Sequence, residues 1–408
     1  MGKGKLFYGY YMVAAGFTLH VIGFIIYGSY GVFFAPLLDE FGWTRAAISG
    51  ALSLFMIMWG FFCIIVGSLN DRFGPRLTLT SCGLIWGLGC FLLSQVTAIW
   101  QLYLYYGVLV SLGMSSVDVL PLTTTARWFV KRRGMMTGIV KGGAGLGIML
   151  APLLANWLIS GYGWRLAFLV LGVIAVVFSV AIAQVLKRDP AKMGLLPYGQ
   201  EAPPEIGKTE SEGLSLRPAL CTRRFWMLCV VYLVIAFCCD AILIHIVQYT
   251  RDMGFSAASA AGVLSTLGAA SIAGRFLCGT ACDKAGVKRM ILACFVLLII
   301  AFSWLLMSRE LWMLYLFALV DGFAHGGLFT LISPWVANLF GLKAHGAILG
   351  TASFIGYAGG ALGPLFFGFV FDVTGSYRLA LTVGTVLCVS AIILSLFIRP
   401  IAKAKPVA

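Results

Sequence analysis

Nine ionisable side chains lie within or at the ends of long apolar stretches, where a charged group is costly and usually faces a protein interior or a water-filled cavity. They are His20, Asp118, Arg127, Lys141, Asp240, His245, Arg275, Asp321 and His325. An arginine side chain binds a carboxylate through two parallel hydrogen bonds and stays charged at physiological pH. Carboxyl and imidazole groups in apolar surroundings can take up and release protons. This set therefore suggests binding of an organic anion coupled to proton movement.

Two cations are predicted at a similar depth in the apolar stretches. Arg275 lies about eight residues, hence ~12 Å, from the end of its stretch, and Lys141 lies about seven residues from the corresponding end. We expect Arg275 to bind the substrate carboxylate, the alternative being a buried ion pair with an aspartate. Lys141 either assists Arg275 or forms a salt bridge with Asp118. In the second case, anion binding would compete with the bridge and free Asp118 to take the proton.

The candidates for proton coupling are Asp118, Asp240, Asp321 and His325. Asp321 and His325 stand one helical turn apart and share one face of a helix. Each could instead be a hydrogen-bonded contact between helices, which is the favoured interpretation for His245. The pair on one face offers too few ligands for a metal ion, so neither a metal nor another cofactor is expected.

Four aromatic residues and a histidine are further candidates for lining a central cavity. His20 either lines it or makes a structural hydrogen bond. The phenol of Tyr357 could reach a carboxylate, and Phe354 precedes it by one helical turn on the same face. Tyr27 and Phe329 are weaker candidates.

The composition requires that most of the chain lie in a membrane. Of 408 residues, 61% are hydrophobic and only 11% are charged, whereas a soluble protein carries roughly a quarter charged residues. A spanning helix needs about 20 mostly apolar residues. We predict an all-α membrane protein with twelve such spans, over residues 8–37, 46–69, 77–94, 100–129, 135–160, 164–186, 225–250, 256–282, 287–307, 311–340, 347–371 and 379–398.

The basic residues predict the orientation of these spans. Twelve spans place both termini on one side, and 22 lysines and arginines fall on that side against 5 on the other. The positive-inside rule therefore places both termini in the cytoplasm. Arg127, near the end of its span, is expected to reach the cytoplasmic surface and to be structural. The net charge of +14 thus follows from membrane topology and does not indicate a nucleic-acid partner.

The chain contains an internal repeat with an offset of 212 residues. This single offset aligns several glycines, including Gly67 with Gly279 and Gly134 with Gly346. Two parallel repeats of six helices are typical of transporters that bind substrate between their halves. We predict an N-terminal bundle over residues 1–186, a polar cytoplasmic linker over 187–224 and a C-terminal bundle over 225–408.

A short motif recurs at the same offset, in the turns after the second and eighth spans. It reads GSLNDRFGPR over residues 67–76 and GTACDKAGVK over 279–288. The motif, the twelve spans and the central linker resemble the major facilitator superfamily over the whole chain. The resemblance implies a cytoplasmic gating or bracing role for six residues of the motif: Asp71, Arg72, Arg76, Asp283, Lys284 and Lys288.

A narrower resemblance is to the monocarboxylate transporter and oxalate/formate antiporter branch. It rests on SYGVFF over 29–34, EFGWTRA over 40–46, Pro121 followed by RWFVKRRG over 127–134 with Gly138, and GRF over 274–276. The resemblance implies transport of small carboxylates, commonly with a proton, through the arginine at position 275.

This chain departs from the branch at two positions. The animal carriers have an acidic residue one turn before that arginine, where this sequence has Ser271, and they use a lysine in the first span, which is absent here. The proton-coupling residues of those carriers therefore cannot be carried over to this chain.

The sequence thus predicts a secondary active transporter for small monocarboxylates such as lactate or pyruvate, coupled to protons, in a bacterial-type inner membrane and active as a monomer. The nearest alternative is an exchanger in which Lys141 and Arg275 together bind a dicarboxylate such as oxalate. A transport-fold sensor is a further alternative, although the linker is too short for an output domain. An enzyme is not expected, because the spans contain neither an HExxH metal motif nor a GxSxG nucleophile elbow.

Overall fold

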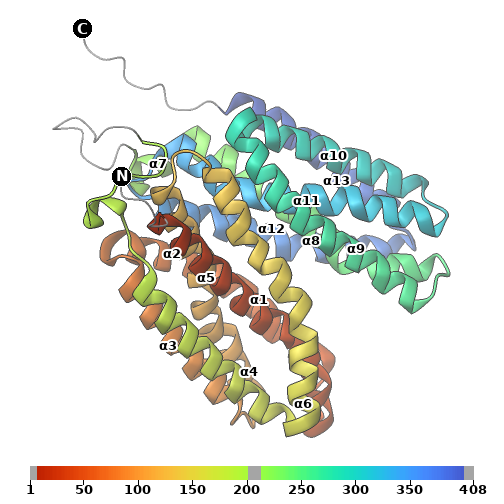
Figure 1. The fold of residues 1–408 in the computed structure, drawn as a ribbon. Coiled ribbons are helices and arrows are strands. Elements are labelled where there is room, and N and C mark those ends of the chain that lie inside the picture. Colours follow the sequence, from red (N-terminus) through yellow and green to blue (C-terminus); the bar gives the residue numbers. More distant parts are fainter. Residues whose placement is uncertain (1–6, 201–212, 399–408) are drawn as a thin grey trace.

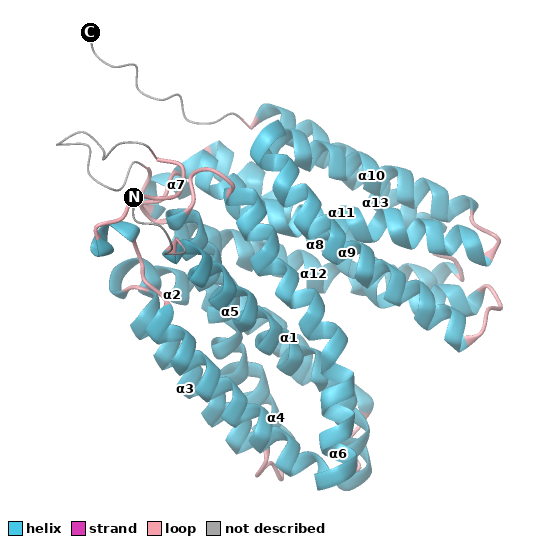
Figure 2. Ribbon diagram, in the orientation of Figure 1, coloured by secondary structure: helices cyan, strands magenta, loops and turns pink. Residues whose placement is uncertain are grey.

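The computed structural model describes residues 7–200 and 213–398 as a bundle of long α-helices with short connecting loops (Figures 1 and 2). The first half contains α1 (Tyr8–Phe41), α2 (Arg45–Phe73), α3 (Pro75–Leu93), α4 (Ile99–Leu102), α5 (Ser111–Trp128) and α6 (Arg133–Val185). The second half contains α8 (Arg223–Asp252), α9 (Ala257–Ala285), α10 (Val287–Met307), α11 (Leu311–Phe340), α12 (His345–Thr374) and α13 (Arg378–Phe397). Within these described ranges, eleven helices are long and apolar enough to cross a membrane. The predicted all-α membrane fold is confirmed.

The fifth and sixth predicted spans form one element, α6, of 53 residues. Gly163 interrupts it with φ 82° and ψ 159°, a conformation that side chains other than glycine rarely adopt. In Figure 1, α6 consists of two arms that meet at the end farthest from the chain termini. Two crossings therefore come from α6, and eleven helices give twelve crossings.

The fourth span is less regular than predicted. Residues Tyr103–Val110, between α4 and α5, form a π-helix of 8 residues. Sequence periodicity does not signal such a segment, because its extra residue per turn changes only the local register of the helix.

The predicted linker is only partly irregular. It contains a 3₁₀ turn over Pro190–Met193 and the short helix α7 (Leu216–Leu220), while residues 201–212 lie outside the described part. Isolated bridges pair Tyr198 with Phe129 and Gly213 with Gly341, so the linker is attached to the ends of α5 and α11.

The internal repeat extends to the helix ends. Thr44 and Ser256, which are 212 residues apart, cap α2 and α9 by accepting hydrogen bonds from Ala47 N and Ser259 N. A hydroxyl at this position satisfies an N–H group that the helix leaves unpaired. The same local sequence therefore starts equivalent helices in the two halves.

The halves meet mainly through two helix pairs, α2 with α12 and α6 with α9. Small residues permit close contact there: a Cβ atom on Gly67 would lie 2.2 Å from the carbonyl oxygen of Gly346. Figure 1 shows the halves close together near the marked chain ends and diverging away from them. We call the side of the membrane on which α1 begins and α13 ends the terminal side.

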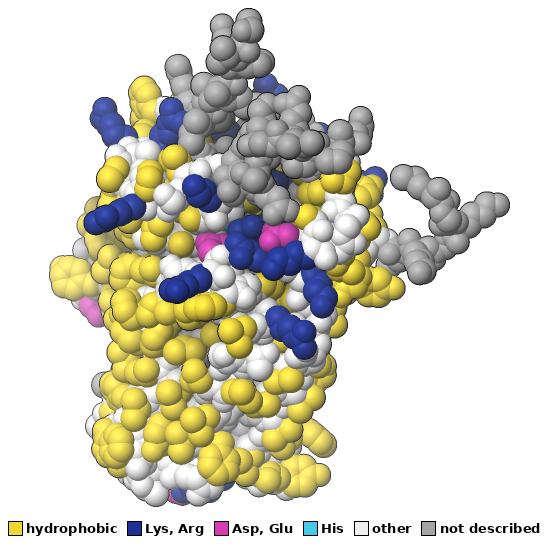
Figure 3. All heavy atoms as spheres, turned by 90° about the vertical axis from the view of Figure 1, so that its left-hand side faces the viewer, with side chains coloured by type: hydrophobic (Ala, Val, Ile, Leu, Met, Phe, Trp, Pro, Cys, Tyr) yellow, Lys and Arg dark blue, Asp and Glu magenta, His cyan; other side chains and the backbone are white. Residues whose placement is uncertain are grey.

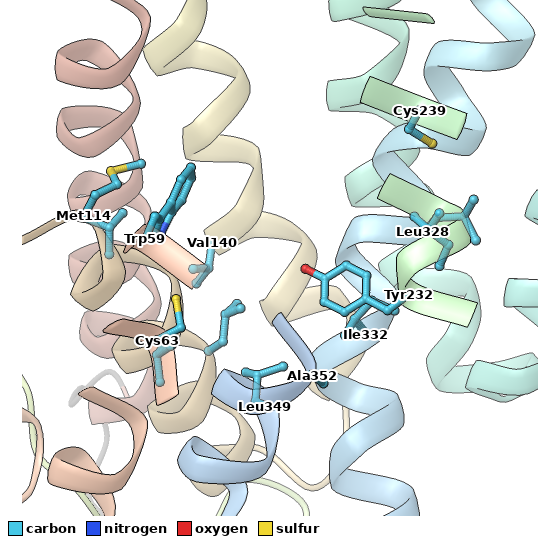
Figure 4. Packing of buried hydrophobic residues seen from close by; sticks show 14 of the residues in the cluster. Trp59, Cys63, Met114, Val140, Tyr232, Cys239, Leu328, Ile332, Leu349 and Ala352 are labelled. Carbon is cyan, nitrogen blue, oxygen red and sulfur yellow. The ribbon is translucent and has the colours of Figure 1, made fainter. Parts of the chain in front are cut away.

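The surface has the polarity of a membrane protein. In Figure 3, lysine and arginine side chains gather at the end beside the uncertain grey segments, and hydrophobic side chains cover the body below. Within the bundle, buried apolar side chains from both halves, including Trp59, Cys63, Leu328 and Ile332, form one continuous core (Figure 4).

Candidate functional site

A cavity of about 170 Å³ lies between the two halves and is lined by side chains from both. The ionisable residues on its wall are Asp118, Lys141, Asp240, Arg275 and His325. The remaining wall is mostly apolar or aromatic: Phe24, Tyr27, Met56, Trp59, Ala144, Ile148, Tyr232, Leu243, Ile244, Phe329, Tyr357 and Gly360. Five of the nine ionisable residues that the sequence suggested therefore surround one space.

Arg275 is held at the cavity by the packing of its own backbone. A Cβ atom on Gly138 of α6 would lie 2.3 Å from the Arg275 carbonyl oxygen, and one on Gly274 would lie 2.1 Å from the carbonyl oxygen of Phe323 on α11. These two glycines allow α6 and α11 to press directly on this turn of α9. The guanidinium is buried and donates through Nη1 to the Lys141 carbonyl oxygen at 2.8 Å, across the interface between the halves.

The Arg275 guanidinium has no acidic partner in the part of the chain that the structure describes. Its Nε atom is buried without a hydrogen-bond partner. A buried arginine normally pairs with a carboxylate, because an uncompensated charge in an apolar environment is costly. The geometry leaves this cation available to an anion that enters the cavity.

Asp118, in contrast, accepts hydrogen bonds from two side chains, Lys141 and Tyr357, and His20 lies close to it. Lys141 Nζ lies 2.5 Å from Asp118 Oδ1, and His20 Nε2 lies 3.4 Å from the same oxygen. The hydroxyl of Tyr357, on α12 in the other half, donates to Asp118 Oδ2. Of the two alternatives for Lys141, the structure contains the salt bridge, and the Tyr357 bond connects that bridge to the second half.

Asp240 and Asp321 have no such partners. Asp240 lines the cavity and makes neither a hydrogen bond nor an ion pair within the described ranges 7–200 and 213–398. Asp321 is completely buried away from the cavity wall, with both carboxyl oxygens unpaired. His325, one turn along from Asp321, lines the cavity and has an unpaired Nδ1.

Several other predicted residues lie apart from the cavity. His20 is fully buried behind Asp118, and its Nδ1 lies 3.1 Å from the Gly16 carbonyl oxygen. His245 contacts the Pro364 carbonyl oxygen at 2.9 Å and the Tyr377 hydroxyl at 3.3 Å, which is the helix contact favoured for it. Phe354 does not line the cavity; it packs against α2, where a Cβ atom on Gly60 would lie 3.1 Å from its Cα. The helices approach too closely there for the ring to reach the open space.

Three aromatic residues of the cavity wall, Phe24, Trp59 and Tyr232, were not among the candidates predicted from the sequence. The Trp59 ring stacks on Tyr357 across the interface, with 4.5 Å between ring centroids. Tyr232 projects from α8 with its hydroxyl directed toward the first half (Figure 4). All three resemble the many aromatics that face lipid, and only their positions in the folded chain distinguish them.

The aspartates of the repeated motif form a reciprocal clamp on the terminal side. Asp71 of α2 accepts a hydrogen bond from Ala347 N, at the start of α12, at 2.9 Å. Asp283 of α9 accepts from Gly134 N at 2.7 Å and from Met135 N at 2.9 Å, at the start of α6. Each aspartate thus caps a helix in the opposite half, where the helix dipole favours a negative charge. We call Asp71, Asp283 and these helix starts the clamp.

Arg127 reinforces the clamp. Its side chain was predicted to extend to the surface, but it is buried. Its guanidinium is buried and lies 3.4 Å from Asp71 and 3.1 Å from Asp189 of the linker, and it donates to the Leu342 carbonyl oxygen at 2.9 Å. The prediction of a snorkelling side chain is wrong because the linker and the loop before α12 cover this position.

The basic residues of the motif differ in their contacts. Lys288 donates to the carbonyl oxygens of Leu396 and Ile398 at 2.6 and 3.0 Å, which attaches α10 to the end of α13. Arg72, Arg76 and Lys284 are exposed.

All hydrogen bonds between the halves, counted over the residues that the structure describes, lie at the level of the cavity or on its terminal side. They join Asp71, Arg127, Asp118, Asp283 and Arg275 to partners in the other half. Together with the divergence of the helices in Figure 1, this distribution describes a conformation that is closed on the terminal side.

Twelve crossings in two similar halves around a central charged cavity are the arrangement of a membrane transporter. Residues 16–307 and 263–408 match the profile of the Major Facilitator Superfamily. The chain belongs to this superfamily, which agrees with the prediction of a transporter and not an enzyme.

Two relatives bear on the narrower resemblance. The chain is 25% identical to monocarboxylate transporter 13 of Rattus norvegicus over 378 residues, covering 92% of this chain and 85% of the relative. It is 26% identical over 285 residues to the uncharacterized MFS-type transporter YhjX of Escherichia coli (strain K12), covering 68% of each chain. The predicted relationship to the monocarboxylate-transporter branch is confirmed at this level.

Solved structures share the fold. The fucose:proton symporter FucP of E. coli matches with a TM-score of 0.73 at 14% identity, covering 95% of this chain and 98% of that one. The human organic anion transporter MFSD10 matches with a TM-score of 0.69 at 17% identity, covering 94% and 98% of the two chains.

Proposed function

We propose that this protein is a secondary active transporter of monocarboxylate anions. The observation that carries the proposal is the position of Arg275, a buried cation on a cavity wall with no acidic partner in the described ranges. A carboxylate that enters the cavity would supply the missing partner through charge-assisted hydrogen bonds. The relationship to monocarboxylate transporters supports the same class of substrate.

The pairing of Lys141 favours a monoanion over a dicarboxylate. Lys141 already forms a salt bridge with Asp118, so one unpaired cation remains on the cavity wall. Binding a second carboxylate at Lys141 would require breaking that bridge and leaving Asp118 without its main partner. This cost argues against the exchange of dicarboxylates such as oxalate.

Asp240 is the proton carrier that fits this site best. It lines the same cavity as Arg275 and lacks a donor or cation that would compensate a negative charge. A monocarboxylate entering with one proton on Asp240 would add no net charge to the cavity, so symport would be electroneutral. Asp118 is paired with Lys141 and Tyr357, and Asp321 is not on the cavity wall, so both are less suited to exchanging a proton with the cavity.

Transport would follow from rocking the two halves, residues 1–186 and 225–408, about the cavity. The clamp closes the terminal side in the present conformation, and its release would open that side while the opposite side closes. The excess of basic residues on the terminal side supports a cytoplasmic location for that side, and we propose a bacterial-type inner membrane. The conformation would then be outward-facing, and one chain contains the complete pathway.

Uptake into proteoliposomes tests this proposal. Radiolabelled pyruvate or benzoate should accumulate when the outside is made more acidic than the inside, with the membrane potential set to zero by potassium and valinomycin. Accumulation should collapse with a protonophore and need no substrate inside the vesicle. Uptake that ignores the pH gradient, or that requires an internal counter-substrate, would contradict proton symport.

A further inference from the structure

We infer that the cavity is built for a monocarboxylate with an aromatic or branched apolar body about the size of a benzene ring, larger and less polar than lactate or pyruvate. This inference rests on the proposed function. It specifies the chemical nature of the rest of the substrate, beyond its carboxylate.

The wall of the cavity is chemically suited to an apolar body. Six aromatic side chains line the cavity, three from each half: Phe24, Tyr27, Trp59, Tyr232, Phe329 and Tyr357. Aliphatic side chains, among them Met56 and Leu243, fill the space between them. An apolar body in contact with such a wall releases water from both surfaces, and each buried CH₂ group contributes about 0.8 kcal/mol. A hydroxy acid of three carbons would leave most of this wall in contact with water.

The volume of the cavity matches a body of about six carbons. The cavity measures about 170 Å³. An apolar cavity of ~150 Å³ in another protein is large enough to bind benzene. The space therefore accepts a ring or a branched chain of about six carbons, with the carboxylate directed at Arg275.

The polar groups of the cavity wall leave one cation for a charged end of the substrate. Arg275 lies at one point of the wall, and its Nε atom has no hydrogen-bond partner. The Tyr357 hydroxyl is engaged by Asp118, and Lys141 is paired. The site thus recognises one charged end, and most of the remaining contact is apolar.

The test is a panel of ligands on the purified full-length protein, measured by thermal shift and calorimetry. Phenylacetate and 4-methylvalerate share a carboxylate and differ in the shape of the apolar body. Acetate and lactate lack that body, succinate adds a second carboxylate, benzyl alcohol lacks the carboxylate, and phenylalanine adds an ammonium group. The inference predicts that phenylacetate binds at least about tenfold more tightly than acetate or lactate, with no stabilisation by benzyl alcohol or succinate.

A cavity-filling variant tests the location of the apolar body. Leu243→Trp should weaken phenylacetate binding at least about tenfold and weaken acetate binding by a smaller factor. Leu316→Trp, at a half-exposed position on the membrane-facing side of α11, is the matched control and should change neither. If Leu243→Trp does not fold, the wild-type panel still decides the question.

The outcomes separate this inference from the proposed function. Acetate or lactate binding as tightly as phenylacetate would overturn the inference and leave a monocarboxylate transporter standing. Tighter binding of phenylalanine would overturn it in favour of a zwitterionic substrate that uses Asp240. If no carboxylate stabilises the protein at any concentration, the proposed function fails as well.

Discussion

The clamp and the cavity contain similar charged residues in opposite states of pairing. In the clamp, Asp71 and Asp283 each accept hydrogen bonds from the start of a helix in the other half. In the cavity, Arg275 has only a backbone carbonyl and Asp240 has no partner within the described chain. Satisfied charges link the two halves, whereas the unsatisfied charges on the cavity wall are those that we propose bind the substrate and the proton. On this proposal, pairing separates the structural charges of the clamp from Arg275 and Asp240.

Asp118 combines features of both regions. It lines the cavity, yet Lys141, His20 and Tyr357 surround it, and Tyr357 belongs to the other half. A substrate that draws Lys141 or Tyr357 away would weaken this connection between the halves. Substrate binding and rearrangement of the interface can therefore be coupled at this one carboxylate.

The largest expected effect is the loss of transport on removing the unpaired cation. Arg275→Gln should reduce carboxylate uptake at least about 100-fold, because a bidentate charge-assisted contact is lost while the side chain remains polar. Initial uptake rates in proteoliposomes measure this effect. Arg165→Gln, a surface arginine on the opposite side, is the control and should retain uptake within about threefold. Near-normal uptake by Arg275→Gln would remove Arg275 from the site.

The next effect concerns the unpaired acid. Asp240→Asn should abolish the dependence of uptake on a pH gradient and lower accumulation about tenfold, while exchange of internal for external substrate continues. Uptake with and without an imposed gradient measures the difference. Asp321→Asn is the comparison, since that carboxyl is buried off the cavity wall. A pH response that persists in Asp240→Asn and vanishes in Asp321→Asn would transfer the role to Asp321.

A smaller effect is expected from weakening the clamp. Asp283→Asn removes the charge that caps α6, at a cost of about 1 kcal/mol, which shifts a two-state equilibrium about fivefold toward opening on the terminal side. Cys282 reports this opening because its thiol packs against Gly134 of the other half. A Cβ atom on Gly134 would lie 2.0 Å from Cys282 Sγ.

Maleimide labelling of a variant that retains only Cys282 should therefore accelerate about fivefold with Asp283→Asn. A variant that retains only Cys388, which is buried within the second half, is the control and should label slowly in both backgrounds. Equal labelling of Cys282 with and without Asp283 would show that the clamp does not determine the conformation.

The smallest effect lies outside the membrane-spanning segments. Hydrogen bonds from Arg165 at 2.7 Å and Trp164 at 2.6 Å lower the pKa of Glu40 below its ordinary value of 4.5. A carboxyl whose pKa is lowered by folding stabilises the protein above its ordinary pKa and loses that contribution as the pH falls through the lowered value.

The melting temperature of wild type should therefore exceed that of Glu40→Gln by no more than about 2 °C at pH 6, since the group is well exposed. The difference should shrink as the pH falls below 4.5 and disappear once the pH lies below the lowered pKa of Glu40. A difference that grows on acidification would contradict this assignment.

Much of the fold could be predicted from the sequence because its causes are local or repeated. Hydrophobic length gives the spans, and the 212-residue offset that pairs Asp71 with Asp283 also pairs their partners, Ala347 with Met135. The clamp is thus a consequence of the repeat. The π-helix at Tyr103–Val110 has no signal of this kind, because it depends on how that helix packs against its neighbours.

The site could be predicted only in part. Their position in apolar stretches identified Arg275, Asp118 and Asp240, because an ionisable group there is costly and usually faces the bundle interior or a cavity. The sequence could not decide whether Lys141 pairs with Asp118, since two cations at equal depth allow either arrangement. It also could not separate Trp59 from aromatics that face lipid, because that distinction requires knowing which face of each helix meets the other half.

Direct binding tests the central claim, that the unpaired guanidinium of Arg275 is completed by a carboxylate. Calorimetric titration of phenylacetate into wild type and Arg275→Gln, with benzyl alcohol as the uncharged probe, separates the charge from the apolar body. The account predicts saturable phenylacetate binding that weakens at least about 100-fold in the variant. Phenylacetate affinity that is unchanged in a folded Arg275→Gln protein would contradict it.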